Sequence, residues 1–398
     1  MKFWQKRVYA DAAAATPLSR GVRREMRRLE GLFGNPGGLH QEAIAAKEEL
    51  DAARSRAAAA LGAHTDEIIF TSGGTESNNL AIFGTLRGLL HKHGELNAVT
   101  TSIEHASVLE PLRALEREGL YVTYLPVDSE GLVEPKALCE VINEQTAFVS
   151  VQMVNSEVGT IQNIREIAKE VRHVRRSKIS TLPLYFHTDA SQAPLWLKLK
   201  VEKLGVDLLT LDAQKMMGPK SSGLLYAKRG TDLEPIIFGG GQEQGFRSGT
   251  ENVVLAGAIS VALEEAQAKC EAQAQKIAEV RDFIIEEIKK VIPDAVLHGA
   301  AGEQRVANNI NFSIPGLNGQ MAVVALNVKG VAASTRSACS AADEEPSHVL
   351  VALGTSETAA QEAVRLTLLP DVTKGEVQRV AHLLYEVANR YRNVVHCI

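Results

Sequence analysis

The chain has 398 residues, of which 45% are hydrophobic and 23% are charged, with a formal net charge of -5. A chain of this length can bury a large core and form two domains. The small negative charge gives no electrostatic reason to bind nucleic acid or a membrane surface, so the composition favours small-molecule chemistry.

The cysteines and the apolar runs predict a cytoplasmic location. The longest apolar run, "VVLAGAISVAL", is much shorter than the roughly 20 residues that a membrane helix needs. Asp11 interrupts the first apolar run, which argues against a secretory signal peptide. The four cysteines are too far apart for a zinc site or a disulfide framework, and they indicate a reducing compartment. They are Cys139, Cys270, Cys339 and Cys397.

Short runs rich in β-branched residues alternate with helical patterns through the first half of the chain. This alternation is typical of an α/β fold in which helices cover a mostly parallel sheet. Polar or glycine-rich clusters follow most of the runs, and ligands bind at the carboxyl ends of such strands. The runs predict strands over residues 67–72, 97–102, 121–127, 147–154, 182–190 and 207–212.

The second half of the chain predicts a long helix and a smaller α+β domain. Leu263–Ile292 contains many helix formers and neither Gly nor Pro, and Pro293 ends the pattern. Strand patterns follow over residues 306–314 and 362–369, with a helix-like segment over 321–330. We therefore expect a large domain over residues 16–262 and a small domain formed by residues 1–15 and 263–398.

Lys215 lies among small and apolar residues in the segment "LDAQKMMGPKSSGLLY". Burial disfavours an ammonium ion and frees the amine as a nucleophile. Asp189 follows a strand pattern upstream, and a pyridoxal cofactor needs an amine for its aldehyde and an anion beside its ring nitrogen. The pair indicates a Schiff-base site. A lysine whose head reaches water and an aspartate that caps a helix are the alternatives.

Two further segments follow predicted strands. In "FTSGGTESNN", Gly73 and Gly74 allow backbone N–H groups to approach an anion at the start of a helix, and Thr75 adds a hydroxyl. An ordinary glycine turn with a helix cap remains open. In "SIEHASV", the imidazole of His105 could stack on a cofactor ring or could serve as a hydrogen-bonded structural histidine.

Two loop segments carry further candidates. The glycine-rich "GGGQEQGFRSGT" contains Arg247 and Thr250, which suit contact with a phosphate or carboxylate, although a mobile surface loop is the alternative. Cys339 lies near Arg336 in the polar stretch "STRSACSAAD". A neighbouring cation favours the thiolate, which is the nucleophilic form of cysteine.

Taken in order, these segments resemble the cysteine desulfurases, which are pyridoxal-phosphate enzymes of the fold-type I, class V aminotransferase-like superfamily. The resemblance extends over nearly the whole chain. It rests on the motifs "YADAAAATP", "GNPGGLH", "FTSGGTESNN", "EHASV", "VNSEVGTIQ", "FHTDASQ", "DLLTLDAQKMMGPK", "GGGQEQGFRSGT" and "RSACSAADEEPSHVLVALG".

The resemblance implies a role for each candidate residue. Lys215 would hold pyridoxal 5'-phosphate as a Schiff base, Asp189 would pair with the ring nitrogen, and His105 would lie over the ring. Gln192 and Asn155 would flank the ring oxygen. Gly74, Thr75 and Gln214 would contact the phosphate, joined by Thr250 from the second subunit of a homodimer. Asn35 and Arg365 would hold the substrate carboxylate.

The resemblance also implies a reaction. Lys215 would move the Cα proton of L-cysteine, and the Cys339 thiolate would take the sulfur as a persulfide and leave L-alanine. The sulfur would then pass to an acceptor protein for iron-sulfur cluster assembly or tRNA thiolation. A related lyase such as a selenocysteine lyase and a catalytically impaired dimeric scaffold are the alternatives. No metal site is expected.

The chain departs from the family pattern near the expected phosphate site. Gln214 replaces the usual histidine before the lysine, and its amide can still donate a hydrogen bond. Asp212 stands where the family commonly has a serine. Because a carboxylate repels a phosphate, we expect Asp212 to point elsewhere or to bind through its backbone N–H. The usual Gly-Arg pair after Arg365 is absent, and Arg336 replaces a glycine.

Overall fold

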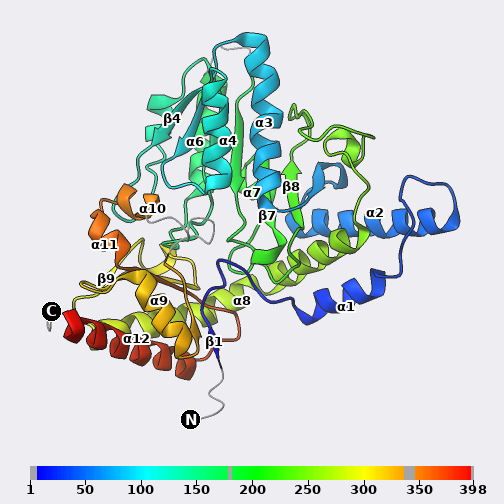
Figure 1. Cartoon of the computed structure of the whole chain (residues 1–398). Helices are drawn as coiled ribbons and strands as arrows, with labels where there is room; N and C mark the ends of the chain where they lie inside the picture. Colours follow the sequence, from blue (N-terminus) through cyan, green and yellow to red (C-terminus); the bar gives the residue numbers. More distant parts are fainter. Residues whose placement is uncertain (1–6, 178–181, 336–345, 396–398) are drawn as a thin grey trace.

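The computed structural model describes residues 7–177, 182–335 and 346–395. Arg336, Cys339 and Cys397 therefore lie outside the described residues. The described chain forms one large sheet, two small sheets and the helices that pack on them (Figure 1).

Seven strands form the central sheet, in the order β2-β8-β7-β6-β5-β3-β4. Strand β8 runs antiparallel to both of its neighbours, and all other pairs are parallel. The predicted α/β fold with a mostly parallel sheet is thus confirmed. The strands are β2 Ile68–Thr71, β3 Asn97–Thr101, β4 Tyr121–Leu125, β5 Thr146–Ser150, β6 Tyr185–Asp189, β7 Leu208–Asp212 and β8 Gly223–Ala227.

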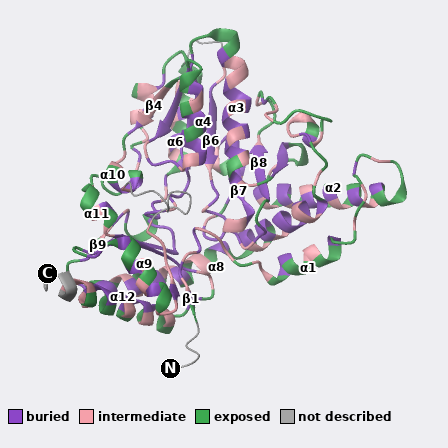
Figure 2. Ribbon diagram, in the orientation of Figure 1, coloured by how far each residue is buried: buried purple, intermediate pink, exposed green. Residues whose placement is uncertain are grey.

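Helices cover both faces of this sheet, and most of its strand residues are buried (Figure 2). Helices α3 and α4 pack on the face that carries Ile69 and Phe148. Helices α2, α6 and α8 pack on the face that carries Phe186 and Leu209. Parallel strands covered on both sides need apolar side chains on both sides. The helices are α2 Gln41–Leu61, α3 Gly74–His93, α4 Ala106–Arg117, α5 Ala137–Val141, α6 Ile164–Ser177 and α7 Val201–Leu204.

The remaining strands form two small sheets below the central one (Figure 1). One is antiparallel in the order β12-β10-β9, and the other is the parallel pair β1-β11. Their strands are β1 Val8–Tyr9, β9 Val296–Leu297, β10 Asn309–Ser313, β11 Val331–Ala332 and β12 Ala363–Thr367. The nearby helices are α9 Gly319–Val328, α10 His348–Ala352, α11 Glu357–Gln361 and α12 Lys374–Val395. The described chain also contains the 3-10 turns η1 Thr65–Glu67, η2 Ala213–Lys215, η3 Glu243–Gly245 and η4 Gly302–Gln304.

Helix α8, Val253–Val291, links the central sheet to the small sheets. It packs against α1, Arg20–Leu29, and α2 on the side of the central sheet and against α12 on the other side. The predicted start at Leu263 is wrong, because the helix begins ten residues earlier at Val253. Asn252 caps it by accepting a hydrogen bond from Leu255 N at 3.0 Å.

Candidate active site

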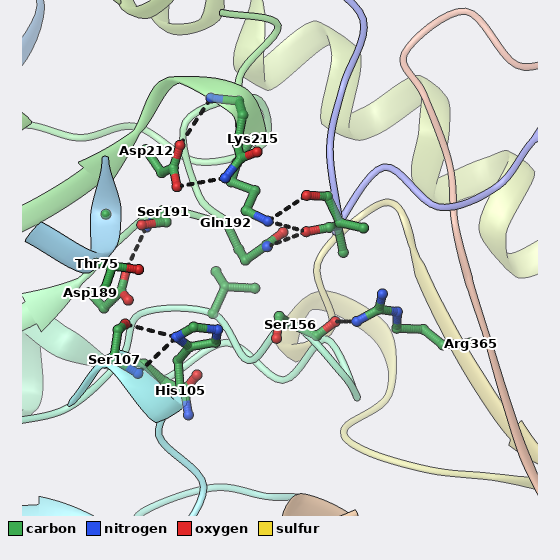
Figure 3. Close-up of a pocket in the computed structure, with 16 residues that line it drawn as sticks. Thr75, His105, Ser107, Ser156, Asp189, Ser191, Gln192, Asp212, Lys215 and Arg365 are labelled. Carbon is green, nitrogen blue, oxygen red and sulfur yellow. Dashed lines mark hydrogen bonds between the residues drawn. The ribbon is translucent and has the colours of Figure 1, made fainter. Parts of the chain in front are cut away.

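A pocket lies where the carboxyl ends of β2, β3, β5, β6 and β7 meet (Figure 3). Ligands bind at this edge in α/β proteins because the turns after the strands converge there. The sequence-predicted residues Lys215, Asp189, His105, Gln192 and Arg365 all line the pocket. The full lining is Ala13, Ala14, Gly74, Thr75, His105, Ser107, Gln152, Val154, Ser156, Asp189, Ser191, Gln192, Asp212, Gln214, Lys215 and Arg365.

Lys215 ends the short turn η2, directly after β7, and is half-buried. Its Nζ donates to Ala13 O at 2.9 Å and to Ala14 O at 2.6 Å. Gln192 Nε2 donates to the same Ala13 carbonyl at 3.0 Å (Figure 3). The N-terminal segment therefore forms one wall of the pocket and fixes the position of the lysine amine.

A chain of hydrogen bonds connects Asp189 to His105. Asn78 Nδ2 donates to Asp189 Oδ2 and to Ser107 Oγ, both at 2.8 Å. Ser107 Oγ lies 2.7 Å from His105 Nδ1, which also accepts from Ser107 N at 3.1 Å. Ser191 N donates to the other oxygen, Asp189 Oδ1, at 2.9 Å. These bonds hold the imidazole and the carboxylate in fixed orientations.

His187 lies in β6, two residues before Asp189, and is fully buried. Its Nδ1 lies 2.9 Å from Ser150 Oγ, and its Nε2 lies 3.1 Å from Thr210 Oγ1. Burial lowers the pKa of His187, although the charge of Asp189 opposes this shift. A neutral His187 therefore adds no positive charge beside Asp189.

The glycine segment before α3 lies at one end of the pocket. Gly73 has φ 151°, and Gly74 begins the helix, so N–H groups at the helix N-terminus can receive an anion. Strand β8 passes very close behind it. A Cβ built on Gly223 would lie 2.5 Å from the carbonyl carbon of Gly73. Glycine at position 223 is therefore necessary for this placement of the loop.

Asp212 ends β7 and faces this glycine segment. Its side chain lines the pocket, and a Cβ built on Gly74 would lie 3.4 Å from Asp212 Oδ2. Gln214 N donates to Asp212 Oδ1, and Gln214 Nε2 donates to Asp212 Oδ2, both at 3.1 Å (Figure 3). The first expectation, that Asp212 points elsewhere, is wrong, because these two bonds hold its carboxylate toward the start of α3. The second, that it binds a phosphate through its backbone N–H, stays a prediction.

Arg365 lies in β12 and is 1% exposed, yet it lines the pocket from the opposite side. Its Nη2 forms an ion pair with Asp11 Oδ1 at 2.9 Å, and its Nη1 donates to Ser156 O at 3.1 Å. Within the described residues, Nε has no hydrogen-bond partner. A buried guanidinium with an unused donor suits the binding of a carboxylate.

Other predicted site residues lie outside this pocket. Asn155 is buried, and its side chain bonds to Ile103 O, Glu157 N and Val158 N, so it braces the chain after β5. Asn35 is exposed in the loop between α1 and α2. Thr250 lines a separate pocket. The structure does not bring these three together with Lys215 in one chain.

Sequence reasoning did not assign roles to several residues that shape the site. Asn78 and Ser107 complete the link between Asp189 and His105. Ala13 and Ala14 supply the carbonyls that bind Lys215. All four lie inside motifs that carry the family resemblance, so the motifs themselves held the signal. Their contacts depend on chain segments that are distant in the sequence.

Glu104 is a fully buried carboxyl group directly before His105. Its Oε1 accepts from Thr101 Oγ1 at 2.7 Å and from Gln152 N at 2.9 Å. Its Oε2 has no hydrogen-bond partner in the described part of the chain. Burial raises the pKa of Glu104 to about 8, and the charge of Asp189 adds to this shift. The native protein therefore holds a proton here at neutral pH.

This proton predicts how Glu104→Gln changes stability with pH. Between the ordinary pKa of 4.5 and about 8, the native state keeps a proton that the unfolded state has released. The free energy of unfolding of the wild type therefore falls as pH rises through this range. We expect the free energy of unfolding of the variant to rise relative to that of the wild type by on the order of a few kcal/mol between pH ~5 and ~8.

Thermal unfolding of both proteins across this pH range measures the difference. Glu110→Gln serves as the control, because the side chain of Glu110 is 59% exposed on α4. A difference between Glu104→Gln and wild type that stays constant with pH would contradict the prediction.

The pocket residues fit pyridoxal phosphate in most respects. An amine, a charged carboxylate and a helix N-terminus face one space, as the aldehyde, ring nitrogen and phosphate of the group require. A Cβ on Gly74 would lie 3.2 Å from both Ser191 Oγ and Asp212 Cβ, so a larger residue there would be tightly packed against the pocket wall. The carboxylate of Asp212 is the one feature that opposes a phosphate.

Comparison with known proteins agrees with this geometry. The family model "Aminotransferase class-V" matches residues 8–380. "Cysteine desulfurase IscS" of Dictyoglomus turgidum is 39% identical over 391 residues, which cover 98% of this chain and 96% of the relative. This chain belongs to the cysteine desulfurases of the class-V aminotransferase family. The predicted resemblance is confirmed, and neither a selenocysteine lyase nor a non-catalytic scaffold is favoured.

Solved structures of similar proteins have the same fold. One titled "NIFS-LIKE PROTEIN" matches with a TM-score of 0.88 and 32% identity, covering 96% of this chain and 99% of that chain. Another, "SspA in complex with cysteine", matches with a TM-score of 0.77 and 34% identity, covering 91% and 99%. These matches extend over both the central sheet and the small sheets.

Within the described ranges, every helix is too short or too polar to span a lipid bilayer. In the same ranges, no group of three or more His, Cys, Asp and Glu side chains is arranged to hold a metal ion.

Proposed function

We propose that this protein is a pyridoxal-phosphate-dependent cysteine desulfurase that converts L-cysteine to L-alanine and retains the sulfur on Cys339. The C–S bond of cysteine breaks, an S–S bond forms to Cys339 Sγ, and the carbon takes up a proton. The observation that carries this proposal is the convergence of Lys215, Asp189 and the N-terminus of α3 on one pocket. This convergence occurs in a chain similar to cysteine desulfurases over 98% of its length.

In this proposal, Lys215 would hold the cofactor covalently, and Asp189 would pair with the ring nitrogen. Bound pyridoxal phosphate supplies an electron sink for the charge left at the substrate Cα. The Lys215 amine moves the Cα proton, because its neutral form can accept one. His105, which Ser107 holds in place, would lie over the ring. These assignments give Lys215, Asp189 and His105 each a role toward the cofactor or the substrate.

The other proposed cofactor contacts bind the ring oxygen and the phosphate. Gln192 and Asn155 would flank the ring oxygen, and Gly74, Thr75 and Gln214 would bind the phosphate. Support comes from Gly74, Thr75, Gln192 and Gln214, which line the pocket. Asn155 lies behind it, where the hydrogen bonds of its side chain fix the segment that contains Ser156.

We assign the substrate carboxylate to Arg365, together with Asn35. For Arg365→Lys we expect the KM for cysteine to rise roughly 10- to 100-fold, with a smaller change in kcat. Lysine keeps the charge but loses the planar fork that binds a carboxylate through two N–H groups. Steady-state kinetics measures the effect. Arg229→Lys is the control, since Arg229 is exposed and pairs with Asp66. An unchanged KM in Arg365→Lys would exclude this role.

We also propose that the active enzyme is a homodimer. Thr250 and Asn35 lie outside the pocket of their own chain, so they would serve the pocket of a second copy. The loop between α1 and α2 projects away from the rest of the chain (Figure 1). It exposes Phe33 by 84% and Leu39 by 94%, and Phe238, directly before the glycine-rich segment, is 83% exposed. Exposed apolar side chains of this size favour burial against a partner.

The proposed chemistry also suggests where the protein acts and where its sulfur goes. We propose a cytoplasmic protein that passes its persulfide sulfur to an acceptor protein for iron-sulfur cluster assembly or tRNA thiolation. The name IscS of several relatives supports this setting. The formal net charge of -5 gives no reason to expect direct nucleic-acid or membrane partners.

A product assay tests the proposed function. The purified, B6-supplemented protein is given L-cysteine and a reductant, and alanine and sulfide are measured. We expect equal amounts of both products over many turnovers. Absence of alanine would indicate a scaffold without activity. Turnover of selenocysteine with none of cysteine would instead indicate a lyase.

A further inference from the structure

We propose that Asp212 links cofactor loading to proton uptake, so that the cofactor phosphate binds only when it shares a proton with this carboxyl group. This inference rests on the proposed use of pyridoxal phosphate. It concerns a residue at which this chain departs from the family pattern, in which a serine hydroxyl commonly donates to the phosphate. A proton on the pair would restore the missing donor.

The position of Asp212 brings its carboxylate to the anion site. Its Oδ2 would lie 3.4 Å from a Cβ on Gly74 and 4.0 Å from a Cβ on Gly73. These glycines begin α3, where backbone N–H groups would bind the phosphate. A phosphate bound to these N–H groups would therefore lie beside the Asp212 carboxylate.

The surroundings prevent Asp212 from turning away. The residue is 8% exposed, and its backbone pairs with Gly223 of β8. Gln214 binds both carboxylate oxygens, one through its backbone N–H and the other through its side-chain amide. Rotation of the carboxylate would break both bonds inside a buried site. The repulsion must therefore be relieved chemically.

The charges around Asp212 do not neutralise a phosphate. Asp189 at the end of β6 adds a negative charge, and Glu76 in the first turn of α3 is already paired with Arg247 at 2.8 Å. Strand β8 contributes only a glycine. The Lys215 amine donates hydrogen bonds to the carbonyls of Ala13 and Ala14. The other ionisable side chains of the pocket are His105 and Arg365.

One proton resolves this repulsion. A phosphate monoester releases its second proton at about pH 6, so it enters near neutrality mostly as a dianion. Two anions forced into contact bind a shared proton more tightly than either does alone. The shared proton also forms a short charge-assisted O–H···O hydrogen bond between carboxyl and phosphate. Loading of the cofactor therefore takes up a proton from solvent and weakens as pH rises.

Calorimetry with pyridoxine 5'-phosphate tests this inference. This probe carries the ring and the phosphate but has no aldehyde, so proton changes at the covalent link do not contribute. Full-length protein freed of cofactor is titrated in buffers of different ionisation enthalpy, which counts the protons taken up. We expect the wild type to take up about one proton more per ligand than Asp212→Ser at pH ~8.

Affinity gives a second readout. Between pH ~7 and ~9, the Kd of the wild type relative to Asp212→Ser should rise toward tenfold per pH unit. Asp212→Asn keeps the shape and the acceptor for Gln214 N without the charge, so it should behave like the serine variant. Pyridoxal, which lacks the phosphate, should bind wild type and variants with the same pH dependence.

The outcomes separate this inference from the proposed function. Equal proton uptake and a constant Kd ratio, in proteins that load pyridoxal phosphate at Lys215, would overturn the inference and leave the function intact. If mass spectrometry after borohydride reduction finds Lys215 unmodified in wild type and variants alike, the proposed function and the inference both fail. Uptake of the extra proton only in the wild type supports both.

Discussion

Lys215→Ala is expected to lose both the visible absorption of the bound cofactor and the production of alanine from cysteine. The variant lacks the only side-chain amine placed in the described pocket, where Ala13 and Ala14 hold it with two hydrogen bonds. Loss of a positioned acid-base group alone reduces turnover by about 10²- to 10⁴-fold. Loss of the covalent link adds to this effect. Absorption spectra and an alanine assay measure both results.

Lys220→Ala is the matched control for this variant. Lys220 lies five residues further along the same segment and is exposed. Its replacement should leave the absorption and the turnover close to those of the wild type. Lys215→Ala that still absorbs visible light after dialysis, or that still forms alanine at the wild-type rate, would refute the assignment of the covalent site.

Cys339→Ser is expected to retain the cofactor and lose almost all release of sulfur. A serine hydroxyl cannot form an S–S bond with the substrate sulfur, so the transfer step has no acceptor. Cys339 lies outside the described residues, and this prediction rests on its sequence setting and the proposed function. The absorption spectrum reports cofactor binding, and sulfide release in the presence of reductant reports transfer. Loss of the cofactor is not expected.

Two other cysteines provide controls within the same chain. Burial and the neighbouring Glu170 raise the pKa of Cys139 to about 11, and burial raises the pKa of Cys270. Both therefore remain thiols at neutral pH and are poor nucleophiles. Cys139→Ser and Cys270→Ser should keep the activity of the wild type. Full sulfide release from Cys339→Ser, or its loss in either control, would contradict a persulfide on Cys339.

The parallel strands could be predicted from sequence because they are buried on both faces. Each appears as a short, β-branched run, and a polar cluster follows most of them. Strand β8 was missed. Its five residues, Gly223–Ala227, have the sequence GLLYA, which contains no β-branched side chain and so lacks the signal that marked the other strands. The beginning of α8 was missed because Ala256 to Ser260 are all buried, which removes the amphipathic pattern.

The part of the site that could be predicted consists of residues whose side-chain type itself indicates the chemistry. Asp189 ends a strand, and Lys215 and His105 each follow one, so their meeting at one edge follows from the fold class. The orientation of Asp212 was not predictable. It depends on a local hydrogen bond to the side chain of Gln214 and on the close approach of Gly74, which is distant in sequence. Sequence spacing reports neither contact.

The length of α8 limits how this protein can be divided. The boundary expected between residues 262 and 263 falls inside its single run from Val253 to Val291. A truncation there would cut α8 in two. The first fragment would end in only ten residues of the helix and would lose the rest of it. Chimeras that exchange the cysteine-bearing portion between relatives should therefore join at Asn252 or after Ile292, so that α8 comes whole from one parent.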